Sequence, residues 1–175
     1  MIKTAMIQTR PVSVERWSVT SAESFETIVA RMEREIGRPE MSVFWQEAAA
    51  AGTLAELEGV VNHSIGPAGL MEFVRFDHGR ILRKVPGANA GQSLRLVIGN
   101  PLIMKEMAKH VPDAGSYAPV TVLIDERQDG VHLSYDRMAS LLAPYGNSEA
   151  SKVARDLDAK IEALLTRAAH EGGGL

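Results

Sequence analysis

The chain has 175 residues with 22 acidic and 19 basic side chains, which gives a formal charge of −3. Hydrophobic residues make up 45% and charged residues 23%, the balance of a globular protein, and this excludes intrinsic disorder and collagen-like sequence. The absence of cysteine excludes disulfide scaffolds, Fe–S clusters and cysteine nucleophiles, and it fits a reducing, cytoplasmic location. The length predicts a single domain over residues 1–175.

Composition also argues against two classes of partner. No apolar run approaches the roughly 20 residues that cross a bilayer, and the first residues lack the pattern of a signal peptide. A pI near 6.0 lacks the basic surplus of a nucleic-acid-binding domain. We therefore expect neither a membrane nor a nucleic-acid partner.

The N-terminal part of the sequence predicts a strand followed by a helix. Apolar and polar residues alternate over Val12–Val19, which is typical of a half-buried strand. Apolar residues then recur every three or four positions over Phe25–Ile36, so this segment predicts an amphipathic helix. Thr20 and Glu23 have the spacing of a capping box ahead of it.

Residues 41–66 predict two short helices. The second follows a Thr53-x-x-Glu56 pattern, which is a second capping box. Phe44 and Trp45 in the first helix are either core residues or part of a contact surface.

The pattern then changes to strands. We expect a hairpin of Leu70–Asp77 and Arg80–Val85, joined by a tight turn at His78-Gly79. A loop at Pro86–Gly91 precedes a third strand, Ser93–Gly99.

A short helix and a second hairpin follow. Asn100-Pro101 is a strong helix start, because Asn caps free N–H groups and Pro at the first helical position loses no hydrogen bond. The helix ends before Pro112. Asp129-Gly130 predicts the turn between strands at Pro119–Glu126 and Val131–Tyr135.

The last element is a long helix capped by Asn147 or Ser148, and residues 171–175 form a tail. Strands joined by short turns form antiparallel sheets, and the helices must cover one face. The fold class predicted is therefore α+β, an antiparallel sheet with a long C-terminal helix packed on it.

Three segments resemble the bacterial family known as domain of unknown function 302. They are RLVIGNP at 95–101, APVTVLIDE at 118–126 and GVHLSYD at 130–136. Their order and spacing carry the resemblance. The predicted N-terminal strand and helix also fit the family, whereas residues 40–69 have the character of a helical insertion.

The resemblance implies a curved antiparallel sheet held by helices in the order β-α-β(4)-α, similar to a half-domain of the TATA-binding protein. It also implies a homodimer, and the family's biochemical role is unsettled. The fold likeness carries no DNA-binding function with it. Some members have cysteines where this chain has Gly99 and Val120, so thiol chemistry at those positions is excluded here. The family positions retained are Asn100, Pro101, Pro119 and Asp136.

One group of polar residues suggests acid–base chemistry. Asp77-His78 ends one predicted strand, and His132, Tyr135 and Asp136 lie on another. Such residues can supply an acid, a base and an orienting carboxylate. The alternative interpretations are that Asp77-His78 belongs to a turn and that Asp136 braces the loop before the last helix.

A second group suggests an anion site. The helix start at Asn100 presents free N–H groups, with Arg95 on the preceding strand and further basic residues on the predicted hairpin. Alternatively, Asn100 caps only its own helix and the basic residues form a solvated face. No histidine spacing indicates a metal site, and no phosphate-loop or G-x-S-x-G pattern is present, so we expect no metal and no cofactor.

We therefore expect a homodimeric domain that binds a small ligand, anionic or partly apolar, between sheet and helix. The residues predicted to bind it are Asp77, His78, Arg95, Asn100, His132, Tyr135 and Asp136. The first alternative is an enzyme with His78 or His132 as general base and an Asp partner. The second is an interaction module that uses Phe44, Trp45 and the helical insertion.

Overall fold

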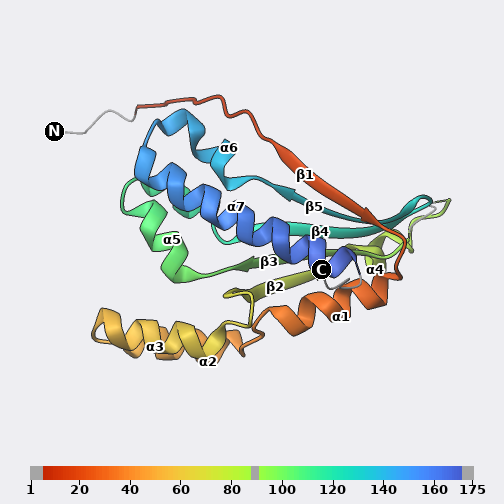
Figure 1. Cartoon of the computed structure of the whole chain (residues 1–175), viewed down its shortest axis with the longest axis horizontal. Helices are drawn as coiled ribbons and strands as arrows, with labels where there is room; N and C mark the ends of the chain where they lie inside the picture. The colour runs from red at the N-terminus through yellow and green to blue at the C-terminus, as the bar shows by residue number, and fades with distance from the viewer. Residues whose placement is uncertain (1–5, 88–90, 171–175) are drawn as a thin grey trace.

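A computed structural model describes residues 6–87 and 91–170 of the chain. Five strands form one antiparallel sheet in the order β1-β5-β4-β3-β2 (Figure 1). The strands are β1 (Arg16–Ser21), β2 (Met71–Asp77), β3 (Ser93–Gly99), β4 (Val120–Arg127) and β5 (Gly130–Asp136).

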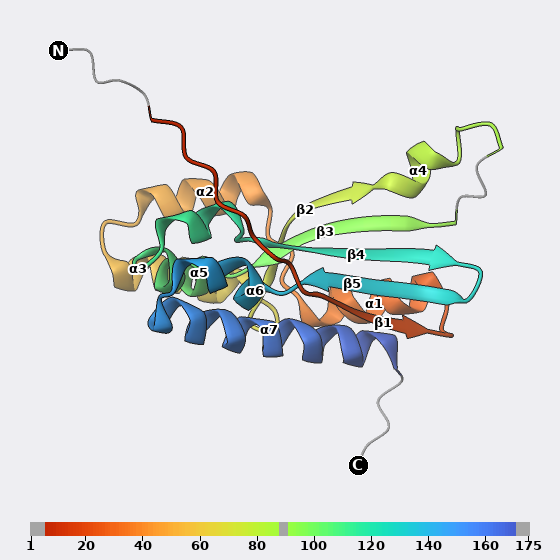
Figure 2. The same cartoon turned by 90° about the horizontal axis from the view of Figure 1, so that it is seen from above.

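Helices cover one face of this sheet. The long C-terminal helix α7 packs beside α1 on that face, and the opposite face has no helix across its middle in the described part of the chain (Figure 2). The α-helices are α1 (Phe25–Glu35), α2 (Met41–Ala50), α3 (Leu54–Ser64), α4 (His78–Leu82), α5 (Pro101–Ala108), α6 (Met138–Leu142) and α7 (Ser148–Ala169). Two 3₁₀ turns are η1 (Pro112–Ser116) and η2 (Ala143–Tyr145). The predicted α+β class is confirmed.

The alternation of side chains along the central strands explains the two faces. In β4, Val122 and Ile124 are fully buried, whereas the preceding residue Thr121 is exposed. Leu133 of β5 is also fully buried and meets Ile161 of α7 in the same apolar core. We call the face under α1 and α7 the covered face and the opposite one the open face.

The N-terminal strand is shorter than predicted and begins later. β1 spans Arg16–Ser21, because these residues find partners in β5, where Arg16 lies opposite Asp136. The predicted capping box is wrong, since Thr20 pairs with His132 in the sheet. The cap of α1 is instead Ser24, whose side chain accepts a hydrogen bond from the backbone N–H of Thr27.

The predicted strand Arg80–Val85 is also wrong. The side chain of Asp77 accepts a hydrogen bond from the backbone N–H of Arg80, at 2.7 Å, and this cap turns His78–Leu82 into the short helix α4. The partner of β2 is consequently β3. Of the predicted loop at 86–91, residues 88–90 lie outside the described residues, as does the predicted tail.

Several local predictions are confirmed. The two helices of residues 41–66 are present, and Thr53 and Glu56 form the expected capping box. Asn100 caps α5 and Asn147 caps α7. Phe44 and Trp45 differ in burial: Phe44 is a core residue, whereas Trp45 is 54% exposed.

Candidate functional site

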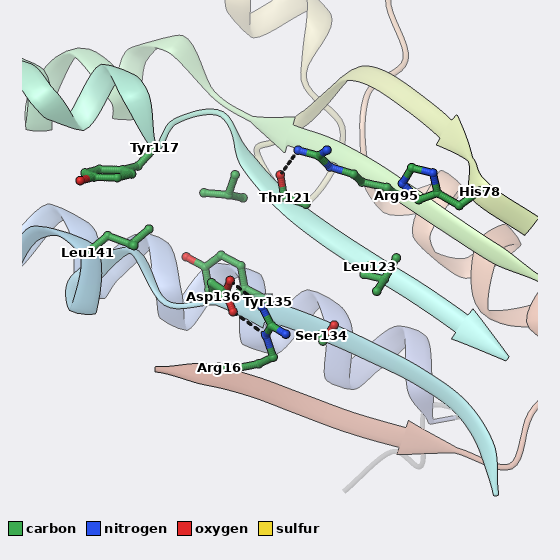
Figure 3. Close-up of a pocket in the computed structure, with 11 residues that line it drawn as sticks. Arg16, His78, Arg95, Tyr117, Thr121, Leu123, Ser134, Tyr135, Asp136 and Leu141 are labelled. Carbon is green, nitrogen blue, oxygen red and sulfur yellow. Dashed lines mark hydrogen bonds and ion pairs between the residues drawn. The ribbon is translucent and has the colours of Figure 1, made fainter. Parts of the chain in front are cut away.

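A hollow of about 430 Å³ lies on the open face, at the end where η1 and α6 meet the sheet (Figure 3). Its polar lining residues come from four strands and from α4: Arg16, His78, Arg95, Thr121, Ser134 and Asp136. Its less polar lining residues are Tyr117, Val120, Leu123, Tyr135 and Leu141. The hollow therefore combines an apolar floor with charged groups at its sides.

One side of the hollow is an ion pair. Arg16 and Asp136 are direct partners across β1 and β5, and the guanidinium donates two hydrogen bonds of 2.7 and 2.9 Å to the carboxylate. The hydrogen bonding and the negative charge of Asp136 raise the pKa of Arg16. Because both side chains are partly exposed, the pair adds little to stability, but it neutralises Arg16.

Arg95 of β3 is the second cation of the hollow. Its guanidinium donates to the hydroxyl of Thr121 at 3.3 Å and lies 5.6 Å from the ring centroid of Phe76, its neighbour on β2. Within residues 6–87 and 91–170, no carboxylate lies within ion-pair distance of Arg95. Among the described residues, its guanidinium therefore interacts with a ring and a hydroxyl and with no opposite charge.

His78 is placed beside these groups by α4. It is the first residue of the helix, and its ring stacks on Phe76 with 6.2 Å between centroids and 6° between planes. Phe76 thus lies beside both His78 and Arg95. Among the described residues, no hydrogen bond links His78 to Asp136 across the hollow.

The far end of the hollow is less polar. Tyr117 follows η1, and its hydroxyl lies 3.3 Å from that of Tyr145. This contact and the nearby Asp113 raise the pKa of Tyr145, so the hydroxyl remains neutral. Leu141 of α6 completes this end.

A buried carboxylate holds α6 in place beneath the hollow. Asp158 of α7 accepts hydrogen bonds from the backbone N–H groups of Met138 and Ala139, at 2.7 and 3.0 Å, and from the hydroxyl of Tyr135, at 2.5 Å. Asp158 thereby caps the start of α6. Burial, followed by the contact with Asp158, raises the pKa of Tyr135. The hydroxyl of Tyr135 is therefore a structural donor.

The structure brings together part of the predicted site. His78, Arg95, Tyr135 and Asp136 all line the hollow. The other three predicted residues lie elsewhere, each with its own structural contacts.

Asp77 caps α4. Asn100 caps α5 through its side-chain oxygen and donates from Nδ2 to the carbonyl oxygen of Gly69, at 3.0 Å. His132 lies on the open face, where it contacts Thr20 at 3.3 Å and Asp129 at 2.8 Å. This contact with His132 lowers the pKa of the exposed Asp129.

The sequence did not single out Arg16, Thr121 or Leu141 as site residues. The alternation of side chains in two strands was the available signal for Arg16 and Thr121, since it places them on one face once the register is known. No periodicity indicated α6, a helix of five residues, so Leu141 had no signal.

The hollow is also on the other side of the sheet from the place predicted for the ligand. Between the sheet and α7, side chains such as Leu96, Leu133 and Ile161 are fully buried in one continuous core. The hollow is instead open to solvent, on the face of the sheet away from α7.

Two kinds of feature are absent from the described residues. No group of three or more His, Asp or Glu side chains in residues 6–87 and 91–170 is arranged to hold a metal ion. Among the helices of those same residues, none has the length and apolar character needed to cross a bilayer.

Comparison with known proteins identifies the family. The family model "Domain of unknown function DUF302" matches residues 47–168, well over half of the chain. The chain belongs to the DUF302 family. The match begins inside the segment 40–69, so part of α2 and all of α3 fall within the family region.

The fold of this DUF302 chain has a solved counterpart. The crystal structure of an uncharacterized conserved DUF302 protein from Bacillus stearothermophilus has a TM-score of 0.60 to it, at 11% identity. The match covers 87% of this chain and 97% of the other, and at this identity it shows the fold alone. No curated protein matches the chain.

Proposed function

We propose that this DUF302 domain binds a small molecule with one anionic group and an apolar body, in the hollow on the open face. The observation that carries the proposal is Arg95, which has no carboxylate partner among the described residues and stands over an apolar floor that includes Leu123. A guanidinium is a fixed fork of donors that suits carboxylate and phosphate oxygens.

The neighbours of Arg95 fit the same ligand chemistry. His78 can donate a second hydrogen bond to the anion, and the hydroxyl of Ser134 adds a neutral donor on β5. Arg16 contributes less, because Asp136 already neutralises it. The anion is thus expected on the β3 side of the hollow.

The apolar body of the ligand is expected at the opposite end. Tyr117 and Leu141 line that end and are partly exposed, while Leu123, also partly exposed, lies beside its register partner Arg95. Covering them would contribute about 25 cal/mol for each Å² of apolar surface removed from water. Pockets with a mostly apolar lining and a few polar groups are the common form of small-molecule site.

The His/Asp acid–base enzyme stays a prediction with less support. His132 is bonded to Asp129 outside the hollow, and Asp136 inside it is bonded to Arg16. The geometry of the described residues therefore favours binding over proton transfer.

The test uses 8-anilinonaphthalene-1-sulfonate, a fluorescent probe with one anionic group on an aromatic body. Its titration into the wild-type protein is expected to saturate with enhanced fluorescence. Arg95→Met, which keeps an unbranched apolar stem and removes the guanidinium with its charge, is expected to weaken probe binding by about tenfold, the effect of losing one charge-assisted contact.

Arg155→Met is the matched control, because Arg155 is an exposed arginine of α7 outside the hollow. It should leave the titration unchanged. Equal binding by wild type and Arg95→Met, or equal loss in both variants, would show that the probe binds elsewhere and would overturn the proposal.

A further inference from the structure

The helical turn that follows β2 carries exposed apolar side chains on one side. α4 is capped by Asp77 and ends at Leu82, but backbone hydrogen bonds continue the turn to Val85. Lys84 donates to the carbonyl oxygen of Ile81 and Val85 to that of Leu82, each at 3.0 Å. Residues three or four apart on such a turn are neighbours. Ile81, Leu82 and Val85 therefore lie together, and they are 66%, 43% and 51% exposed.

Basic residues are interleaved with these apolar ones. Residues 78–87 contain Arg80, Arg83 and Lys84 and no Asp or Glu. All three basic side chains are exposed, and none forms an ion pair with another described residue. We call the three basic residues, together with the three aliphatic ones, the α4 tip.

The acidic side chains close to the α4 tip have other partners. Asp77, directly before it, accepts the hydrogen bond that caps α4. Three more acidic residues lie on the hairpin of β4 and β5, at the same end of the sheet (Figure 2). They are Asp125, which is 2.5 Å from Arg127; Glu126, which accepts a hydrogen bond from the backbone N–H of Gln92; and Asp129, which is 2.8 Å from His132.

The α4 tip projects from the molecule. Gly79 holds α4 against β3, because a Cβ there would lie 2.8 Å from the backbone nitrogen of Ser93. Beyond Gly79, each residue from 80 to 87 is exposed. Figure 2 shows α4 standing off the end of β2, on the side of the sheet away from α7. A projecting turn can enter a soft surface without rearrangement of the remaining chain.

We propose that the α4 tip docks this domain on the surface of an anionic lipid bilayer. The three aliphatic side chains enter the headgroup region, and the three basic ones contact lipid phosphates while their stems lie along the same surface. Near an anionic membrane each Lys or Arg strengthens binding about fivefold, and the aliphatic side chains gain by leaving water. This inference does not depend on the proposed small-molecule ligand.

The mixture of side chains favours a bilayer over a nucleic acid. A phosphate backbone would attract the basic residues but would leave Ile81 and Val85 in water, because bases stack on aromatic rings. A bilayer accommodates both kinds of side chain at once.

Two properties of the whole chain are compatible with such docking. The formal charge of −3 does not prevent it, because exposed charges act through salt solution over only about 10 Å at roughly 0.1 M ionic strength. The lack of a spanning segment led us to expect no membrane partner, but docking on the surface needs no such segment.

Co-sedimentation with vesicles tests the role of charge. The wild type is expected to bind vesicles of mixed phosphatidylcholine and phosphatidylglycerol and to stay in solution with phosphatidylcholine alone. R80E/K84E is expected to weaken binding to the mixed vesicles by more than about tenfold. K152E/R155E makes the same change in net charge on exposed residues of α7 and should bind like the wild type.

A second pair of variants tests the aliphatic side chains. I81S/V85S keeps all three basic residues and is expected to weaken binding to the mixed vesicles by about tenfold, because less apolar surface leaves water. Leu54→Ser is its control, since Leu54 is a leucine of α3 that is 53% exposed, and it should bind like the wild type. Circular dichroism should show that every variant is folded.

A fluorescent label reports whether the tip enters the bilayer. The chain has no cysteine, so Val85→Cys gives a single attachment point for a polarity-sensitive nitrobenzoxadiazole dye. Its emission is expected to shift to the blue when mixed vesicles are added. The same dye on Lys152→Cys should show no shift.

Three results would overturn the proposal. They are a wild type that stays in solution with mixed vesicles, full binding by I81S/V85S, and unchanged emission from the dye on Val85→Cys. Retention of the wild type by single-stranded DNA in place of vesicles, lost in R80E/K84E and kept in I81S/V85S, would assign the basic residues to a nucleic acid instead.

Discussion

The covered and open faces of the sheet are made by the same strands, but their side chains differ in burial. On the covered face, alternate residues such as Val122 and Leu133 are fully buried in one core with α1 and α7. On the open face, their neighbours Thr121, Leu123 and Ser134 retain contact with solvent and line the hollow. Stability is expected from the first face and binding from the second, because buried apolar area stabilises a fold whereas a ligand needs accessible groups.

The sharpest test of this division is a pair of leucine truncations. Leu133→Ala, on the covered face, is expected to lower the free energy of unfolding by about 3 kcal/mol, because it leaves a cavity in a close-packed core. Leu123→Ala, on the open face, is expected to cost less than about 1 kcal/mol. Urea denaturation followed by circular dichroism measures both. Equal losses would mean that the two faces contribute alike to stability.

A smaller loss of stability is expected at Asp158, which links α7 to the start of α6. Asp158→Asn places an amide donor among the N–H groups of Met138 and Ala139 and removes the charge that caps α6. We expect a loss of about 2 kcal/mol, the usual cost of disrupting a buried hydrogen-bonded group. Amide hydrogen exchange should show faster exchange confined to α6, and uniform acceleration through α7 would contradict a local capping role.

The smallest effect is a pH dependence at Tyr135. Its pKa is raised in the folded protein by burial, so its contribution to stability is present below the unfolded pKa of about 10 and declines as the pH rises above it. The unfolded chain loses the proton first, and the slope approaches about 1.4 kcal/mol per pH unit. In Tyr135→Phe the fall in stability above about pH 10 should be shallower, by a difference in slope that approaches that value. The same slope in both proteins would show that Tyr135 ionises equally in the two states.

The sequence predicts helices well where the signal is local. The spacing of apolar residues in α1 and α7 is set by the helical repeat, and the caps at Thr53, Asn100 and Asn147 depend on atoms within four residues. These features form in the same way wherever the segment is placed.

Predictions failed where a distant partner decided the outcome. Thr20 has the spacing of a cap, but the pairing of β1 with β5 draws it into the sheet opposite His132. Residues 80–85 were predicted as a strand because His78-Gly79 has the composition of a tight turn, yet β2 takes β3 as its partner, and Asp77 caps the segment as α4. Strand boundaries are set by the neighbouring strand, which the local pattern does not contain.

The candidate site shows the same limit more strongly. His78, Arg95, Tyr135 and Asp136 were predicted and lie around one hollow, whereas Asn100 and His132 are held by contacts of their own outside it. The chemical type of each polar residue is visible in the sequence, but the residues that lie next to it in space depend on strand register. Asp158 gave no signal, because an acid on a helical pattern is ordinarily a solvated residue.

By itself, the sequence determined the class of fold and most of the helices, because these follow from periodicity and local hydrogen bonding. Only the tertiary structure decided that the hollow lies on the face away from α1 and α7. It also decided that Arg95 stands in that hollow without a carboxylate partner among the described residues. The reason is physical: the position of a side chain relative to its neighbours is fixed by strand register and helix packing, which join residues far apart in the chain.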